Sequence, residues 1–134
     1  MRVTVHTDGG ARGNPGPGAA AAVVSAPGVR DEASVRLGET TNNVAEYRGL
    51  LLGLERARSL GATEVDVVMD SELVVNQITG RYRVRSQDLA PLHRAAIDAL
   101  SGFSTWTIRA VRRGENARAD ALVNAALDGD SRAA

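Results

Sequence analysis

The sequence predicts an α/β fold with a mixed sheet, in which an antiparallel meander is followed by a helix and a parallel crossover. Short alternating apolar segments occupy residues 2–37, a helical apolar period follows at 44–57, and another apolar strand comes at 65–69. A strand, a helix and a strand in this order normally place the second strand parallel to an earlier one. With 134 residues, 43% of them hydrophobic, the chain can form one domain around a single core.

The meander is predicted from three short strands. Alternating valines indicate a first strand that ends at Asp8, because the glycines and prolines after this residue favour a turn. Asp-Gly is also a common hairpin dipeptide, so Asp8 taken alone has a plain structural explanation. A second strand is expected at residues 19–24 and a third at residues 33–37, joined through a turn at Pro27-Gly28.

The first helix is the best-marked element of the chain. Its apolar side chains recur at spacings of three and four residues: Val44, Tyr47, Leu51, Leu54 and Ala57. Asn42 or Asn43 is expected to cap its start, and Gly61 to end it. Glu46 follows Asn43 by three residues, which is the spacing of a capping box and a plain structural explanation for this acid.

The next elements are predicted by short apolar patterns. Residues 65–69 indicate a strand that ends at Asp70, which we expect to lie parallel to the first strand. Residues 71–79 indicate a helix whose N-cap is Asp70 or Ser71. Residues 81–85 are expected to be irregular or extended.

The last third of the chain is predicted to contain a helix, a strand and a closing helix. The helix is marked by Leu89, Leu92, Ala96 and Leu100, with Pro91 in its first turn. The strand is marked by Trp106, Ile108 and Ala110. In the closing helix, residues 115–127, the inward side chains are Ala119, Leu122, Val123 and Ala126, and the opposite polar stripe is Asn116, Asp120 and Asn124. We expect one folded domain at residues 1–128 and a flexible tail or the start of a linker at 129–134.

Composition excludes some classes of function. Sixteen basic and 16 acidic residues cancel, so nucleic-acid binding would depend on local clusters rather than on a global positive charge. The chain has no lysine and no phosphate-loop motif, which disfavours binding of a nucleoside triphosphate. It also has no cysteine, no apolar run of membrane-spanning length and no charged-then-apolar leader, so a cytoplasmic protein without membrane contact is expected.

Three acids are brought to one edge of the sheet by the predicted topology. Asp8 and Asp70 follow neighbouring parallel strands, and Glu46 lies early in the helix that connects them. Ligands of open α/β sheets bind at this edge. Asp120 joins the group if the closing helix packs beside the same edge, although a charge on a polar helix face is usually only solvated.

Such a group of carboxylates requires positive charge. Two carboxylates about 4 Å apart repel each other by roughly 4 kcal/mol at an effective dielectric constant of 20. Oxygen ligands without a nearby histidine or cysteine suit Mg²⁺ or Mn²⁺ rather than zinc. Two such ions, about 3.5 to 4 Å apart, would activate water and stabilise the leaving oxygen of a phosphodiester.

Motifs along nearly the whole chain resemble those of ribonuclease H type I. They are Thr7-Asp8-Gly9-Gly10, Gly13-Asn14-Pro15-Gly16, Thr41-Asn42-Asn43 before Glu46, Asp70-Ser71, and Ala119-Asp120-Ala121-Leu122. The resemblance implies a ribonuclease H-like fold, with a five-stranded mixed sheet flanked by helices. It also implies an endonuclease that cleaves the RNA strand of an RNA/DNA hybrid and leaves a 5′-phosphate and a 3′-hydroxyl. The implied catalytic residues and ligands of two Mg²⁺ or Mn²⁺ ions are Asp8, Glu46, Asp70 and Asp120.

The resemblance further implies a set of substrate contacts. Asn14, Asn42 and Asn43 would lie along the hybrid, and Thr41 would contact a DNA phosphate. The backbone of a glycine-rich segment would approach the RNA, where 2′-hydroxyls mark the strand to be cut: Gly9, Gly10 and Ala11. Three more residues complete the expected substrate contacts: Ser71, Arg112 and Arg113.

Three departures from the family pattern stand out. The loop before the last aspartate lacks the histidine that many members carry, because His6 and His93 lie elsewhere. Arg112 or Arg113 could supply the electrostatic part of that role, but a guanidinium stays charged and cannot transfer a proton near neutral pH. Glu72, two residues after Asp70, replaces a glutamine that family members often have at this position. The basic handle helix is also missing, and the short arginine-rich segment at 81–85 remains, either as a solvated loop or as a hybrid contact.

Two alternatives to this function remain open on the sequence. One is a nucleic-acid-binding module that keeps the fold but has weak catalysis, suggested by the missing histidine and by Glu72. The other is a related metal-dependent nuclease acting on another duplex, because fold alone does not decide the substrate. In each case we expect a monomer with a nucleic-acid partner and no small-molecule cofactor.

Overall fold

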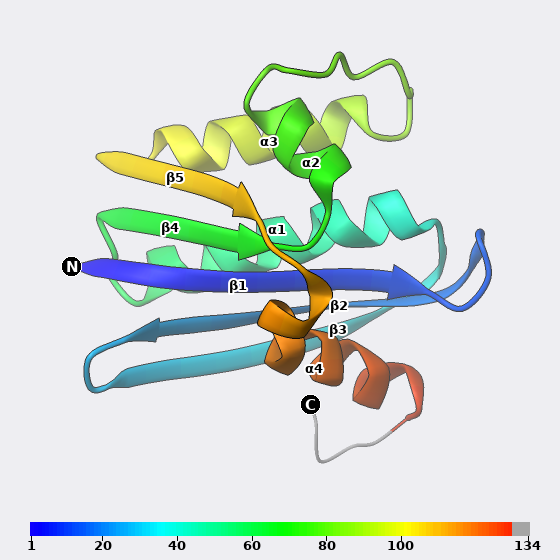
Figure 1. The fold of residues 1–134 in the computed structure, drawn as a ribbon, viewed down its shortest axis with the longest axis horizontal. Helices are drawn as coiled ribbons and strands as arrows, with labels where there is room; N and C mark the ends of the chain where they lie inside the picture. Colours follow the sequence, from blue (N-terminus) through cyan, green and yellow to red (C-terminus); the bar gives the residue numbers. More distant parts are fainter. Residues whose placement is uncertain (130–134) are drawn as a thin grey trace.

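The computed structural model describes residues 1–129 and contains a five-stranded mixed sheet in the order β3-β2-β1-β4-β5 (Figure 1). Its strands are β1 (Arg2–Ala11), β2 (Gly16–Ala26), β3 (Val29–Thr40), β4 (Glu64–Met69) and β5 (Thr105–Ala110). The first three form an antiparallel meander, while β4 is parallel to both β1 and β5. The predicted α/β class and the meander are therefore confirmed. The tail expected at 129–134 lies, from residue 130 onward, outside the described residues.

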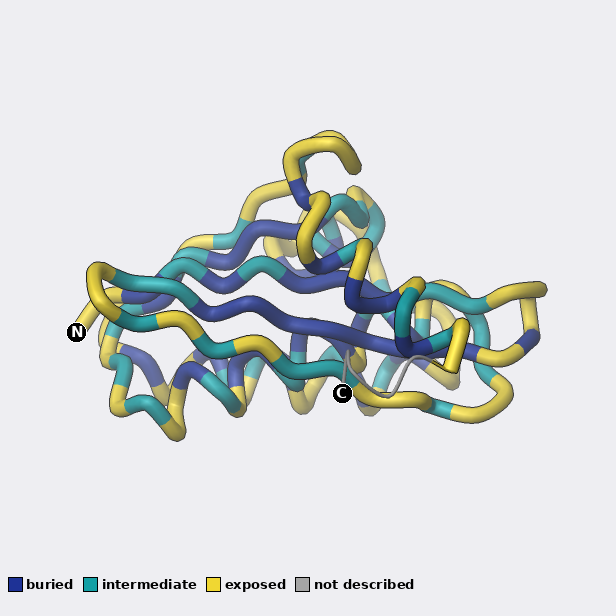
Figure 2. Tube along the Cα trace, turned by 90° about the horizontal axis from the view of Figure 1, so that it is seen from below, coloured by how far each residue is buried: buried dark blue, intermediate teal, exposed yellow. Residues whose placement is uncertain are grey.

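The helices cover both faces of the sheet. One face carries α1 (Asn42–Ser59), together with α2 (Glu72–Ile78) and α3 (Ala90–Ser101), and the other carries α4 (Ala117–Leu127) (Figure 1). The edge strand β3 has many exposed positions, whereas β2 is buried along most of its length (Figure 2). Within residues 1–129, no helix combines the length and apolar character needed to cross a membrane.

Two hydrophobic cores hold these layers together. The larger core joins alternate valines of β1 and β4 to apolar side chains of the helices: Val3, Val5, Val65, Val67, Tyr47, Leu50, Leu54, Leu92 and Leu100. The smaller core joins β2 to α4: Ala19, Ala21, Val23, Ala119, Leu122, Val123 and Ala126. The inward face predicted for the closing helix is thus confirmed. Because β1 lies between the two helical layers, its carboxyl-terminal half is held from both sides.

Asp8 does not end its strand, so this prediction was wrong. β1 continues to Ala11, and its glycines pair with β2 in register, Gly9 with Ala20 and Gly10 with Ala19. Glycine accepts extended backbone, and the cross-strand pairing here outweighs its weak strand propensity. The parallel pairing with β4 nevertheless stops earlier, at His6. Asp8 therefore lies beyond the last β1–β4 pair but inside the β1–β2 ladder.

The caps of the first two helices differ in part from the expectation. Thr41, rather than Asn42 or Asn43, is the N-cap of α1, and its hydroxyl accepts a hydrogen bond from the Val44 N–H at 3.3 Å. Both asparagines are instead the first helical residues, so Glu46 is not part of a capping box. Ser71, one of the two predicted alternatives, caps α2 through the Val74 N–H at 3.2 Å.

The closing helix is shorter than predicted. Residues Arg113–Asn116 form a 3₁₀ helix, η1, and the α-helix begins at Ala117. Asn116 is only 1% exposed, so its assignment to the solvated polar stripe was wrong. Its side chain points toward β1 instead of toward solvent. A helical pattern in the sequence cannot predict this contact, because the partner lies on a strand far away in the sequence.

Glycines allow α1 to lie unusually close to β1. A Cβ at Gly9 would overlap the carbonyl of Ala45 in α1, and a Cβ at Gly49 would overlap the carbonyl of Asp8. A Cβ at Gly53 would come within 2.6 Å of a methyl carbon of Val5. Because backbone meets backbone at the first two positions, no side-chain rotation can relieve an added methyl group. This close approach determines how near the part of α1 that carries Glu46 lies to the part of β1 that carries Asp8.

We predict that Gly49→Ala lowers the free energy of unfolding by about 1 to 3 kcal/mol, the usual cost of overpacking a close contact. The measurement is a urea denaturation curve followed by circular dichroism. Gly114→Ala is the matched control, because an added Cβ there meets nothing within 4 Å. Its effect should stay within about 0.5 kcal/mol. Equal stability of the Gly49→Ala variant and the wild type would contradict the close approach.

Candidate active site

Three carboxylates from separate parts of the chain meet at one end of the sheet. Asp8, Glu46 and Asp70 each offer an oxygen, and these atoms all lie within 4.8 Å of one another. Asp8 comes from β1, Glu46 from the second turn of α1, and Asp70 from the residue that follows β4. They come together because α1 packs against β1, and β4, which follows α1, pairs parallel to β1.

Burial makes this cluster electrostatically costly. Asp8 is only 5% exposed. Burial, followed by the charge of Asp70, raises its pKa far above the usual value for an aspartate. Burial and the charges of Asp8 and Asp70 raise the pKa of Glu46 to about 9. Burial likewise raises the pKa of Asp70, against the opposing influence of Arg113.

The cluster has the oxygen chemistry that a hard divalent cation requires. Glu46 Oε2 and Asp70 Oδ2 are buried and accept no hydrogen bond from any described residue. Buried oxygens without a hydrogen bond are rare, and here both residues line a groove that also contains Glu72 and Glu115. The donor set contains oxygen alone, which suits Mg²⁺ or Mn²⁺. A divalent cation would satisfy both oxygens and cancel the repulsion between the carboxylates.

Asp120 lies at the border of this cluster. It sits in the first turn of α4, and its charge contributes to the raised pKa of Asp8 and of Asp70, after the larger effect of burial. It is not one of the three residues whose oxygens lie within 4.8 Å of one another. Asn124, one turn later, donates to its carboxylate at 3.4 Å. Asp120 therefore belongs to the same charged region but holds a more open position.

An open groove of about 620 Å³ gives access to the carboxylates. Its lining combines acids with the segment between β5 and α4: Glu46, Asp70, Glu72, Ala110, Val111, Arg112, Arg113 and Glu115. Arg113 is 80% exposed along its side chain, and its Nε lies 3.9 Å from Asp70 Oδ2. That distance is too long for a hydrogen bond but close enough for a charge interaction. Arg112 is exposed and is the N-cap residue of η1.

The asparagines predicted to contact substrate hold the loops around the start of α1. The Asn42 side chain accepts from the Ala11 N–H at 2.9 Å, and Asn14 accepts from the Asn42 N–H at 3.0 Å. These two hydrogen bonds connect the β1–β2 loop to the start of α1, close in sequence to Asp8 and Gly9. Asn43 is exposed.

The remaining predicted contacts have mixed surroundings. Thr41 and Ser71 use their hydroxyls as helix caps, which leaves their lone pairs only partly available to a ligand. Gly9 is buried against α1, whereas Gly10 is partly exposed. Packing against α1 is sufficient to explain the glycine at position 9, so the predicted contact of Gly9 with RNA is not needed to account for it.

Asn116 is a buried polar residue whose place beside the site was not predicted from the sequence. The Asn116 side chain donates to the carbonyl of Thr7, the residue before Asp8, at 2.8 Å. An asparagine at the start of a helix is typical of an N-cap, so the sequence contains no signal for this longer connection. Only the packing of α4 and η1 against β1 reveals it.

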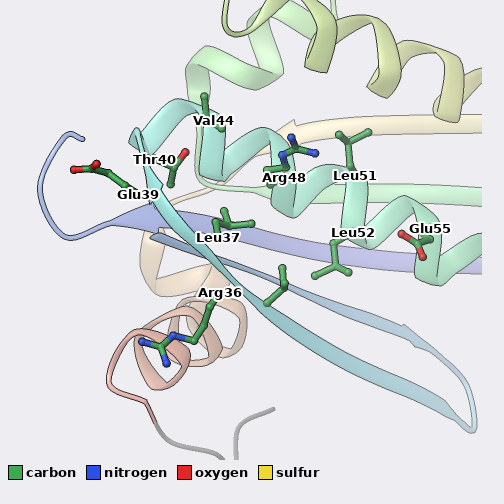
Figure 3. A pocket seen from close by; sticks show the side chains of 10 residues that line it. Arg36, Leu37, Glu39, Thr40, Val44, Arg48, Leu51, Leu52 and Glu55 are labelled. Carbon is green, nitrogen blue, oxygen red and sulfur yellow. The ribbon is translucent and has the colours of Figure 1, made fainter. Parts of the chain in front are cut away.

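A second groove lies apart from the carboxylates, between β3 and α1. It has a volume of about 640 Å³, and Figure 3 shows leucines facing it beside arginines and glutamates of both elements. It begins near Thr40 and Val44, where β3 passes into α1, and continues along α1 to Glu55. Acids and bases alternate along it without forming a cluster that could bind a metal. Of these two grooves, the first is the one lined by residues of the carboxylate cluster.

Known proteins resemble this chain over almost its whole length. A family model described as "Reverse transcriptase-like" matches residues 6–126. The "Bifunctional protein Rv2228c" of Mycobacterium tuberculosis is 45% identical over an alignment of 137 positions, which covers 100% of this chain and 38% of that protein. The "Ribonuclease HI" of Halobacterium salinarum is 41% identical over 129 residues, 95% of this chain and 65% of that protein. The chain thus spans less than two thirds of the length of these curated relatives.

Solved structures show the same fold over almost their whole length. The crystal structure of RNase H1 from Halobacterium salinarum superimposes with a TM-score of 0.92 at 41% identity, covering 96% of this chain and 99% of that one. LC11-RNase H1, a protein isolated from compost, was solved in complex with an RNA/DNA hybrid. It superimposes with a TM-score of 0.89 at 40% identity, covering 95% of this chain and 97% of that one.

We predict that the metal-free protein loses stability as the pH rises from about 4.5 to about 9. The sign follows from Glu46, since folding raises its pKa from 4.5 to about 9 and the folded state therefore holds a proton that the unfolded state has released. Thermal unfolding in a chelator between pH 5 and pH 9 measures this slope. Glu46→Gln should flatten it and stabilise the metal-free protein at pH 8 by about 1 to 3 kcal/mol.

Glu39→Gln is the control for this experiment, because Glu39 is exposed and is not a member of the cluster. Glu32 does not disturb the measurement, since its arginine partners lower its pKa to about 2, below the pH range used. A melting temperature that is independent of pH in the chelator would contradict the buried, mutually repelling cluster. Added Mn²⁺ should raise the melting temperature more at pH 8 than at pH 5.

Proposed function

Because the chain belongs to the ribonuclease H type I family, we propose that it is a ribonuclease H that hydrolyses the RNA strand of RNA/DNA hybrids. The cut would be endonucleolytic and would leave a 5′-phosphate and a 3′-hydroxyl. The observation that carries this proposal is the trio of carboxylates whose oxygens lie within 4.8 Å of one another, two of them with a buried oxygen that accepts no hydrogen bond from any described residue. A structural cluster would have paired those oxygens with donors.

In the proposed mechanism the carboxylates bind two Mg²⁺ or Mn²⁺ ions. Asp8, Glu46 and Asp70 would hold the ions, with Asp120 as the fourth ligand on the open side. The ions would supply an activated water and neutralise the leaving oxygen of the phosphodiester. The chain itself presents the carboxylates in a fixed arrangement, since each is placed by the backbone of a different element. All four acids come from one chain, so the proposal includes action as a monomer.

The hybrid would lie across the start of α1 and the glycine-rich part of β1. The Asn14 and Asn42 hydrogen bonds keep these two segments in register, which supports a preformed surface for a duplex. LC11-RNase H1, a protein of the same fold, was solved with such a hybrid. We propose that Asn43 and Thr41 contact the DNA strand and that Gly10 and Ala11 face the RNA, where 2′-hydroxyls distinguish it from DNA.

Arg113 would take the electrostatic part of the role of the missing loop histidine. Its guanidinium lies beside Asp70 at the mouth of the groove and is otherwise solvated. It would stabilise negative charge on the phosphate that is being cleaved, but it would not move a proton. Arg112, exposed on the same segment, is better placed to attract the hybrid backbone than to reach the carboxylates.

We predict that the purified protein cleaves a labelled RNA/DNA hybrid in Mg²⁺ or Mn²⁺, and that Asp70→Asn lowers kcat by at least about 100-fold. The loss should equal or exceed the effect of removing an outer partner of a metal ligand. Asp98→Asn, which removes an exposed acid from α3, is the matched control and should keep wild-type activity. Equal cleavage by the wild type and Asp70→Asn would contradict the carboxylate mechanism.

The same assay separates the alternative functions. A hybrid, an RNA duplex, a DNA duplex and a DNA duplex with a single ribonucleotide are compared under identical conditions. Preference for the DNA duplex would identify a related nuclease with another substrate. Tight hybrid binding without cleavage by the wild type in either metal would identify a binding module. The end groups of the products, read by phosphatase and ligase treatment, test the proposed chemistry of the cut.

We predict that hybrid affinity falls as salt rises, because arginines bind the phosphate backbone. Arg112→Ala should reduce the slope of log affinity against log salt by about 1, since one phosphate contact is lost. Arg113→Ala should instead lower kcat by about 10- to 100-fold with a smaller effect on affinity. Fluorescence anisotropy in Ca²⁺ measures affinity separately from turnover. An affinity independent of salt, or identical effects of the two substitutions, would contradict these roles.

A further inference from the structure

The Asn116 side chain makes a connection that neither helix formation nor core packing requires. It is 1% exposed, and its amide donates to the Thr7 carbonyl at 2.8 Å across 109 positions of sequence. Its other side-chain atom, Oδ1, is buried and has no hydrogen-bond partner among the described residues. Burying an acceptor without a hydrogen-bond partner lowers stability, so a purely structural role does not explain an asparagine at this position.

The position of Asn116 at the start of α4 offers it a local hydrogen bond that it does not make. It occupies the N-cap position of that helix, yet its side chain makes no capping hydrogen bond. Asparagine is among the best N-cap residues because it normally satisfies the free N–H groups of the first turn. Here that local bond is absent and the amide reaches a different strand. The geometry therefore favours the long-range bond over the local one.

The bond lies just beyond the point at which β1 stops pairing with β4. The parallel pairing of β1 with β4 ends at the pair His6–Val68, and Thr7 is the next residue of β1. Asp8 follows Thr7 directly, and Asp70 follows the end of β4. Between the two acids the strands no longer pair, and the Asn116 amide holds β1 at this point.

Three charged groups of the proposed site are adjacent to this connection. Asp8 is next to the residue that accepts the bond. Arg113 precedes Asn116 by three residues in η1, and Asp120 follows it by about one turn of α4. A single hydrogen bond thus links the strand that carries one acid to the segment that carries the arginine and another acid.

We infer that Asn116 is a positioning residue, which fixes Asp8 relative to Asp120 and Arg113 so that the carboxylates bind metal in a productive arrangement. This inference rests on the proposed function. Asn116 would not touch the substrate or the ions. It would act through the backbone of β1 and the start of α4, as outer partners of metal ligands do.

A buried hydrogen bond elsewhere in the chain provides a control for purely structural effects. The Tyr47 hydroxyl donates to Gln77 Oε1 at 2.6 Å, and Gln77 is 6% exposed. Gln77→Met keeps the size of that side chain and leaves the Tyr47 hydroxyl without its partner. Its cost to stability should resemble that of Asn116→Ala. Tyr47 follows Glu46 in sequence, but its bond to Gln77 joins two side chains in the larger core, whereas the Asn116 bond holds the backbone of β1.

The test compares Asn116→Ala, Asn116→Ser and Gln77→Met with the wild type. Thermal unfolding records stability, isothermal titration with Mn²⁺ records metal affinity without substrate, and hybrid cleavage at saturating metal records kcat and KM. We expect Asn116→Ala to lower Mn²⁺ affinity and kcat by about 10- to 100-fold each, with KM changed by less than about threefold. Serine keeps a hydroxyl donor and leaves room for a bridging water, so Asn116→Ser should recover part of both losses.

Gln77→Met should lose stability while keeping Mn²⁺ affinity and kcat within about twofold of the wild type. Equal Mn²⁺ affinity and kcat in the Asn116 variants and in Gln77→Met would overturn the inference. If Asn116→Ala does not fold, the serine variant decides with the same two outcomes. Absence of hybrid cleavage by the wild type would refute the proposed function instead, and the Mn²⁺ titrations would still decide the role of Asn116.

Discussion

The close approach of α1 to β1 is the constraint on which the rest of the structure depends. Gly9 and Gly49 have no side chain at the points where the two backbones meet, and any added Cβ would overlap a carbonyl group. This contact brings Glu46 over the strand that carries Asp8. The parallel return through β4 then adds Asp70 at the same end of the sheet. The cluster is therefore a product of backbone packing rather than of attraction among its members.

Its members repel one another, and the fold must hold them in spite of this repulsion. Burial raises the pKa of Asp8, Glu46 and Asp70, which means that their charged forms are disfavoured in the folded protein without cations. Two hydrophobic cores, one on each face of the sheet, supply the compensating stability. Strain of this kind is typical of sites whose ligand completes the structure.

Much of the fold could be predicted because it follows from local periodicity and from the handedness of crossovers. The alternating valines, the apolar period of α1 and the return strand before Asp70 determine the order of elements, and the order determines the edge at which the acids meet. The errors at the end of β1 and at the start of α1 occurred where two local explanations compete. Thr41 outcompetes Asn42 as a cap, and strand pairing extends β1 beyond Asp8 through glycines that usually favour turns.

The sequence by itself determined the types of the elements, their topology and the neighbourhood of Asp8, Glu46 and Asp70, since these depend on patterns within a few turns or strands. Tertiary structure alone decided how near these acids lie, that Gly9 serves packing, and that Asn116 reaches β1. The physical reason is that hydrogen bonds and steric contacts between remote segments depend on where the layers finally pack. A residue's own neighbours in sequence carry no record of a partner 109 positions away.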